Sequence, residues 1–161
     1  MKNIKLTLLC FLFLNASCAQ KDNSIVSPSE KNYEIVNVYK NVDIPWSIEF
    51  LDENTIIYAE KKGEIYIVKN NTAVKVENVP EVYFRGQGGL LDLELHPDFK
   101  NNNLIYMSYA SGSREQGGGN TAVARAKLID NTLTDIEVLY KGEENSTKGQ
   151  HYGSRLQFDK D

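Results

Sequence analysis

Cysteine is almost absent from this chain of 161 residues. Its two cysteines, Cys10 and Cys18, lie close to the N-terminus, and no thiol follows them. Residues 19–161 therefore contain neither a disulfide framework nor a cysteine-based metal site. Histidine is equally rare, since His96 and His151 are the two that the sequence holds.

The chain also lacks a surplus of positive charge. Its formal net charge is -4, which does not favour a nucleic acid as partner. No stretch repeats apolar residues at helical spacing over three turns. Tyrosine, in contrast, occurs nine times, and isoleucine and valine are frequent, a composition that favours strands. Hydrophobic residues at 41% and charged residues at 25% are typical of a globular chain and exclude a disordered one.

Residues 1–18 are predicted to be an export signal. A basic start precedes the apolar run 8–14, which is too short to span a bilayer as a mature helix. Residues 15–18 resemble a bacterial lipoprotein box, whose cysteine, Cys18, would carry a lipid anchor; residues 17–19 also fit a signal-peptidase site. We favour lipidation, so the membrane contact would be a lipid alone. The protein is predicted to be a periplasmic or outer-membrane-anchored lipoprotein, with secretion as the alternative.

A polar segment, residues 19–32, is predicted to be a flexible tether between the signal and the folded part, which spans residues 33–161. Short alternating segments bounded by turn residues then predict strands. The first expected strand is 33–39. Two groups of four follow, with a glycine-rich loop at 112–119 in the second group, and a third group begins at residue 154. The eight strands are predicted at 46–50, 55–60, 64–68, 72–76, 89–95, 103–110, 122–128 and 135–140.

One pattern, apolar-polar-apolar followed by an acidic turn, occurs at 47–52, 92–98 and 155–161. Phe50 and Leu95 are 45 positions apart, close to the period of about 40–50 residues that propeller blades show. The repeat predicts an all-β chain that forms about the first two blades of a β-propeller and the start of a third. Because a propeller needs several blades, we expect an N-terminal part of a longer protein. A complete small β-domain or a β-sandwich is the alternative.

Two glycine-rich loops each place one polar side chain shortly before a predicted strand. Gln87 lies in residues 86–92 and His151 in residues 149–155. Loops positioned by a rigid sheet commonly carry the chemistry of β proteins. The His151 imidazole suits a general base near pH 7, and the Gln87 amide suits a hydroxyl ligand. Alternatively, His151 is a surface or turn residue and Gln87 bonds its own backbone.

Other polar residues have structural interpretations. Arg155 is predicted to tie loops together by hydrogen bonds, and Trp46 is predicted to lie in the core. Asp92, Asp98 and His96 are expected at turns, at blade edges or between blades. Solvated or interstrand roles are favoured for two further cations, Arg85 and Arg125.

Four separated motifs, at residues 44–48, 86–99, 121–125 and 151–159, resemble in their order those of the quinoprotein glucose/sorbosone dehydrogenases. The resemblance covers about residues 40–161. It implies a six-bladed β-propeller that oxidises aldose sugars at the anomeric carbon to lactones. The implied cofactors are pyrroloquinoline quinone (PQQ) and Ca²⁺, whose ligands are expected mostly beyond residue 161, with no metal site in this span. Arg85 and Arg125 could meet a PQQ carboxylate, although solvated or interstrand roles are favoured for them. An external electron acceptor is also implied.

The resemblance assigns roles to three residues. It implies that His151 is the general base that removes the proton of the anomeric hydroxyl while hydride passes to PQQ. It places Gln87 against the substrate. Gln150 stands where some members have an aspartate that touches substrate, so we expect Gln150 to contact the sugar and to favour a broad range of aldoses. A non-catalytic propeller that binds a partner at the cell surface is the alternative function, and the isolated 161 residues are expected to be inactive.

Overall fold

A computed structural model describes residues 34–143 and 145–159. The predicted export signal with Cys18 and the predicted tether lie outside the described residues. The chain divides into the units Met1–Ile35 and Val36–Asp161, and the architecture given below is that of the second unit. Among the described residues, no helix combines the length and the apolar character needed to span a bilayer.

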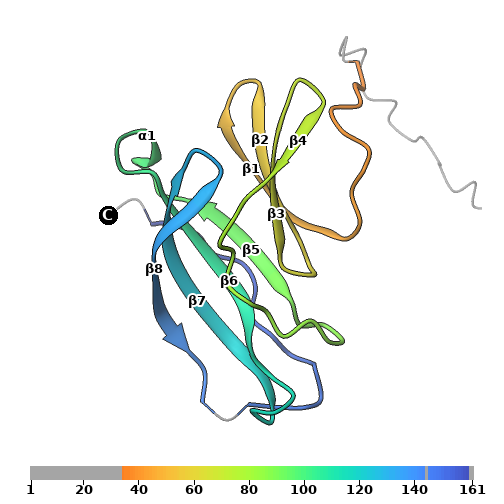
Figure 1. The fold of residues 1–161 in the computed structure, drawn as a ribbon, viewed down its shortest axis with the longest axis vertical. Helices are drawn as coiled ribbons and strands as arrows, with labels where there is room; N and C mark the ends of the chain where they lie inside the picture. Colours follow the sequence, from red (N-terminus) through yellow and green to blue (C-terminus); the bar gives the residue numbers. More distant parts are fainter. Residues whose placement is uncertain (1–33, 144, 160–161) are drawn as a thin grey trace, which may run out of the picture. The chain divides into compact units, whose positions relative to one another are not determined.

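The second unit contains two antiparallel sheets of four strands, each a simple meander in which every strand pairs with the next (Figure 1). This repeated meander is the unit from which propeller blades are built, so the two predicted blades are confirmed. The first sheet contains β1 (Pro45–Asp52), β2 (Thr55–Glu60), β3 (Glu64–Lys69) and β4 (Thr72–Lys75). The second contains β5 (Leu90–Leu95), β6 (Leu104–Ser113), β7 (Gly118–Ile129) and β8 (Thr132–Lys141).

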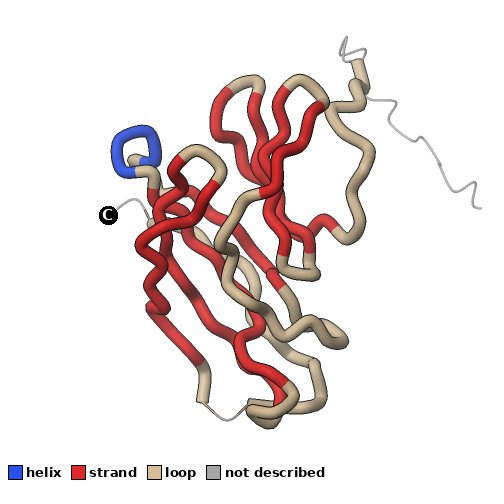
Figure 2. Tube along the Cα trace, in the orientation of Figure 1, coloured by secondary structure: helices blue, strands red, loops and turns tan. Residues whose placement is uncertain are grey.

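Residues that tolerate a left-handed backbone make the connections between strands tight. Asn70 and Asn71, between β3 and β4, have φ values of 50° and 60°, as the two-residue turns that match strand twist require. A four-residue helix, α1 (Phe99–Asn102), separates β5 from β6 (Figure 2). It ends at Asn103, which is left-handed and donates its backbone N–H to the carbonyl of Phe99.

The core lies where the first sheet packs against the second. Strands β1 and β2 both contact β5. Side chains from both sheets form one buried cluster, in which Ile57 and Ile65 of the first sheet meet Leu93 and Met107 of the second, all with no exposed surface. Because these residues alternate along their strands, the period-two pattern that predicts the strands also fixes the faces that pack.

Three predictions about local structure are wrong. Residues 34–39 form no strand, because no described segment pairs with their backbone. Trp46 is not in the core of the described residues, since 44% of its surface is exposed. The glycine-rich loop is shorter than predicted, because β6 and β7 continue into it and pair at Gly112 with Gly119.

Residues 154–159 alternate between half-buried and exposed side chains but pair with no strand among the described residues. Ser154, Leu156 and Phe158 are half-buried, whereas the residues between them are exposed. The Phe158 ring packs edge-on against Tyr106, with 4.9 Å between ring centroids. The predicted start of a third unit is therefore seen as strand-like alternation of burial, but not as a paired strand.

Candidate active site where two glycine-rich loops meet

The two glycine-rich loops predicted to carry chemistry are in direct contact. The Gln87 backbone N–H donates to the Gly149 carbonyl at 2.8 Å. Gly86 and Gly149 both have positive φ values, of 57° and 65°. A Cβ atom on Gly86 would lie 2.4 Å from the Gly149 oxygen, so only glycine permits this approach.

The Gln87 side chain contacts the backbone of His151 at this junction. The Gln87 Oε1 atom accepts a hydrogen bond from the backbone N–H of His151 at 2.8 Å. His151 itself has φ of 62°, a left-handed conformation that is uncommon for residues other than glycine. The bond therefore leaves the imidazole free of Gln87 and fixes the backbone that carries it.

Side chains of the second sheet hold the segment that follows His151. The backbone N–H of Gly153 donates to the Thr121 Oγ1 atom on β7 at 3.2 Å. The Ser108 hydroxyl on β6 donates to the Ser154 carbonyl. The segment thus lies against the second blade through side-chain hydrogen bonds, where a strand would use a backbone ladder.

Asp92 on β5 supplies a charged acceptor for the same segment. Its side chain is 1% exposed; Oδ2 accepts the Leu156 backbone N–H at 2.7 Å and Oδ1 lies 3.1 Å from the Arg155 guanidinium. Asp92 is not in a turn, as one of the two predicted alternatives had it, but lies buried on β5, the edge strand of the second sheet, in agreement with the blade-edge alternative. The prediction that Arg155 ties segments together by hydrogen bonds is confirmed.

Two further carboxyl groups lie near Asp92. Burial raises the pKa of Glu94 above its ordinary value, and the negative charge of Asp92 raises it further. Burial also raises the pKa of Glu49 on β1, with Glu94 and Asp92 adding to the effect. Arg155 opposes both shifts. The guanidinium is therefore the counter-charge for a group of three acidic side chains.

The first blade supports the other side of the site through Lys61. The Lys61 Nζ atom donates to the Gly86 carbonyl at 2.6 Å. The same ammonium group lies 5.3 Å from the ring centroid of Trp46 and 5.9 Å from that of Phe84, within cation–π range. Sequence reasoning did not find Lys61, because neither its spacing nor its neighbours distinguish it from other turn lysines.

The predicted site residues lie at the surface of the junction between the two glycine-rich loops. Gln87, Gln150 and His151 are all exposed, and Gly149, beside them, is buried. His96 lies elsewhere: its Nδ1 atom accepts the Asp98 backbone N–H at 3.0 Å, and its ring stacks with Tyr106 and meets Phe158 edge-on. The structural interpretation of His96 is confirmed.

The two remaining cations differ in their contacts. Arg125 pairs with Glu137 on the neighbouring strand β8, which confirms its interstrand role. Arg85 is exposed, and its backbone carbonyl would lie 2.9 Å from a Cβ atom on Gly149, so it borders the loop that carries His151. Within residues 34–143 and 145–159, no three His, Cys, Asp or Glu side chains gather in a way that would hold a metal ion.

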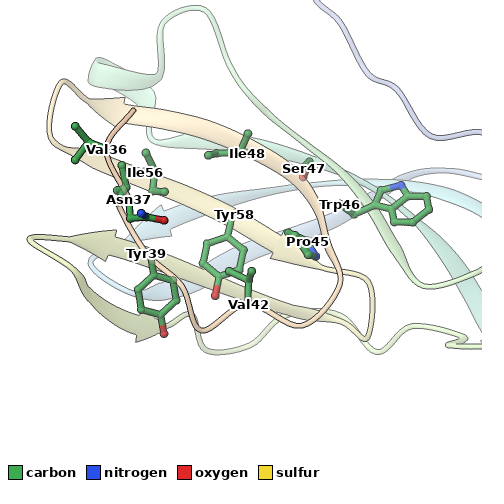
Figure 3. A pocket seen from close by; sticks show the side chains of 11 residues that line it. Val36, Asn37, Tyr39, Val42, Pro45, Trp46, Ser47, Ile48, Ile56 and Tyr58 are labelled. Carbon is green, nitrogen blue, oxygen red and sulfur yellow. The ribbon is translucent and has the colours of Figure 1, made fainter. Parts of the chain in front are cut away.

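A groove of about 420 Å³ lies apart from this site (Figure 3). It runs between residues 36–42 and strands β1 and β2, and its lining is mainly apolar. Tyr39 and Tyr58 face it, with 6.2 Å between their ring centroids. Neither Gln87 nor His151 lines the groove, and it holds no convergent charged groups, so it is not the candidate active site.

Repeated four-stranded meanders with a polar loop junction define the chain as part of a β-propeller. The sequence profile of one family, Glucose / Sorbosone dehydrogenase, matches residues 42–161. The chain belongs to this family.

Two related proteins of known sequence match most of this chain. The aldose sugar dehydrogenase YliI of Escherichia coli strain K12 is 31% identical over 138 residues, which are 83% of this chain and 36% of that protein. The Synechocystis protein slr1608 is 30% identical over 154 residues, which are 88% of this chain and 37% of that protein. This chain therefore spans little more than a third of the length of either relative.

Solved structures share the fold. The soluble aldose sugar dehydrogenase of Escherichia coli, in its apo form, superposes with a TM-score of 0.69 at 30% identity, covering 75% of this chain and 36% of that one. The PQQ-bound aldose sugar dehydrogenase of Streptomyces coelicolor has a TM-score of 0.59 at 20% identity, covering 67% and 33%. The second likeness is one of fold.

Proposed function

We propose that the full-length protein is an aldose dehydrogenase that oxidises the anomeric carbon of a sugar to a lactone. Membership of the Glucose / Sorbosone dehydrogenase family supports the reaction class. The observation that carries the proposal is the exposed His151, whose backbone is fixed by the Gln87 side chain at the junction of two loops.

In this reaction the anomeric hydroxyl loses a proton and the anomeric carbon loses a hydride. A ring nitrogen of His151 accepts the proton, since a neutral imidazole is an effective base near pH 7. PQQ, when bound, supplies the two-electron acceptor for the hydride. The exposed position of His151 leaves its imidazole open to a sugar that approaches from solvent.

The charge of the loop junction fits an anionic quinone. PQQ carries carboxylates, and the exposed Arg85 borders the His151 loop with no acidic partner among the described residues. A guanidinium binds a carboxylate through paired N–H groups. Arg85 would hold one carboxylate, and the remaining PQQ and Ca²⁺ ligands are expected beyond residue 161.

Two exposed amides support the proposed binding of a sugar. Gln87 and Gln150 are exposed on either side of the loop contact, and each can donate to a sugar oxygen. Gln150 is neutral, so it does not stabilise an imidazolium as a carboxylate would. We therefore propose a broad aldose range. The family resemblance supports an external electron acceptor for the electrons that leave PQQ. The N-terminal sequence supports export with a lipid on Cys18.

The test is dye-linked oxidation of a panel of aldoses by the full-length protein, reconstituted with PQQ and Ca²⁺. We expect turnover on several aldoses that is absent when PQQ is withheld. A folded protein that takes up PQQ but oxidises none of the sugars would contradict the proposal and favour a propeller that binds a partner at the cell surface.

A further inference from the structure

We infer that Gln87 is a positioning residue for His151, acting through its amide oxygen on the His151 backbone N–H. This role differs from the substrate contact that sequence reasoning assigns to Gln87. The catalytic part of the inference rests on the proposed function, whereas the backbone contact does not depend on it.

Gln87 binds the opposite loop at two points. Its backbone N–H donates to the Gly149 carbonyl at 2.8 Å, and its Oε1 atom accepts from the His151 backbone N–H at 2.8 Å. Gln150 lies between these two points. One residue therefore fixes both ends of a three-residue segment, and a rigid planar amide provides the second contact.

The conformation of His151 explains why such support is needed. A left-handed backbone at a residue with a Cβ atom is disfavoured and persists where the surroundings hold it in place. His151 has φ of 62°, and Gly149, two residues earlier, has φ of 65°. Without the Gln87 oxygen, the His151 N–H loses its acceptor at a residue whose left-handed backbone is itself disfavoured.

The support continues into the first blade. Lys61, which follows β2, donates to the Gly86 carbonyl at 2.6 Å and so holds the residue next to Gln87. The position of the His151 backbone is thus linked to the first blade through Lys61, Gly86 and Gln87.

This arrangement determines what remains for a substrate. One lone pair of the Gln87 amide oxygen is engaged by the His151 N–H, whereas both amide N–H groups stay available as donors to a sugar. Two substitutions separate the roles. Gln87→Glu keeps an oxygen that can accept the His151 N–H and removes the donors, whereas Gln87→Leu keeps the approximate shape and removes both.

Amide hydrogen exchange at His151 in the full-length protein, without PQQ, tests the inference. We expect exchange about 3- to 10-fold faster in Gln87→Leu than in wild type, the range for losing one ordinary hydrogen bond. Gln87→Glu is expected to exchange at nearly the wild-type rate. Gln157→Leu, at an exposed position past the site, is the matched control and should leave the His151 rate unchanged.

Wild-type exchange in Gln87→Leu would overturn the inference, as would a Glu variant that exchanges as fast as the Leu variant. Exchange at the buried Met107 on β6 reports whether a variant has kept its fold. If Gln87→Leu loses that protection, Gln87→Asn replaces it, because its shorter side chain withdraws the oxygen from the His151 N–H.

Turnover provides the second measurement. A positioning role predicts that Gln87→Leu lowers kcat and that Gln87→Glu restores most of kcat. Both variants lose the N–H donors to the sugar, so KM should rise in both; a raised KM with no loss of kcat in Gln87→Leu would leave a substrate contact alone. If no aldose is oxidised at all, the proposed function fails, but the exchange rates still decide whether Gln87 holds the His151 backbone.

Discussion

Replacing Asp92 by alanine should loosen the segment after His151 much more than replacing its ion-pair partner, Arg155. The two interactions of Asp92 differ in kind. Its buried Oδ2 atom accepts the Leu156 backbone N–H at 2.7 Å. Its Oδ1 atom meets a guanidinium whose side chain is 72% exposed. Asp92→Ala removes both interactions, whereas Arg155→Ala removes only the second.

The magnitudes follow from burial. A hydrogen bond to a charged group contributes about 1.5–3 kcal/mol, and an ion pair with an exposed partner contributes about 0–1 kcal/mol. Asp92→Ala also relieves repulsion on Glu49 and Glu94, which reduces the loss. We therefore expect a local destabilisation of about 2 kcal/mol for Asp92→Ala, or roughly a 30-fold faster exchange, and at most about 1 kcal/mol for Arg155→Ala.

Amide hydrogen exchange of Leu156 in the full-length protein measures both effects. Asp98→Ala, which removes an exposed carboxylate from the turn before α1, serves as the matched control and should leave the Leu156 rate unchanged. An Arg155→Ala variant that exchanges as fast as Asp92→Ala would refute the reasoning, since it would make the exposed ion pair the main constraint.

Three further outcomes are expected. Because the pKa of Glu94 is raised in the folded state, the neutral form of Glu94 contributes to the free energy of unfolding at low pH. This contribution decreases as pH rises from 4.5 through the folded-state pKa. The free energy of unfolding of Glu94→Gln, measured in urea, should lack this part of the decrease. Because Lys62 and Lys75 lower the pKa of Glu64 to about 2, its contribution is present above pH 4.5 and is lost as pH falls through about 2. Glu64 is partly exposed, so Glu64→Gln should lower the free energy of unfolding, measured in urea near neutral pH, by less than about 1 kcal/mol. Gly86→Ala should lower the melting temperature and aldose turnover together, because its Cβ would lie 2.4 Å from a backbone oxygen.

The eight paired strands could be predicted from the sequence because alternation of apolar residues directly encodes a half-buried strand. Residues 34–39 also alternate, yet they form no strand, since a strand needs a partner backbone as well as a pattern. The predicted glycine-rich loop at 112–119 was too long for the opposite reason. Gly112 and Gly119 are typical of a loop, but they pair across β6 and β7, where the ladder continues with little side-chain support.

The residues of the candidate site could be named from the sequence, but their contacts could not. Gln87 and His151 lie 64 positions apart, and no local pattern shows that one amide oxygen binds the other residue's backbone. Asp92 similarly binds Leu156, also 64 positions away, and its place in a turn-like motif pointed to a turn. Long-range side-chain contacts depend on how the blades pack, which composition and periodicity do not specify.

The most direct test of the account compares PQQ-dependent aldose oxidation by full-length wild type, His151→Asn and His96→Asn. Asparagine tolerates the left-handed backbone of His151 while removing the base. Loss of a general base predicts a decrease in kcat of about 10²–10⁴-fold for His151→Asn, with His96→Asn keeping turnover as long as it folds. Full turnover by His151→Asn would contradict the central claim that His151 is the catalytic base.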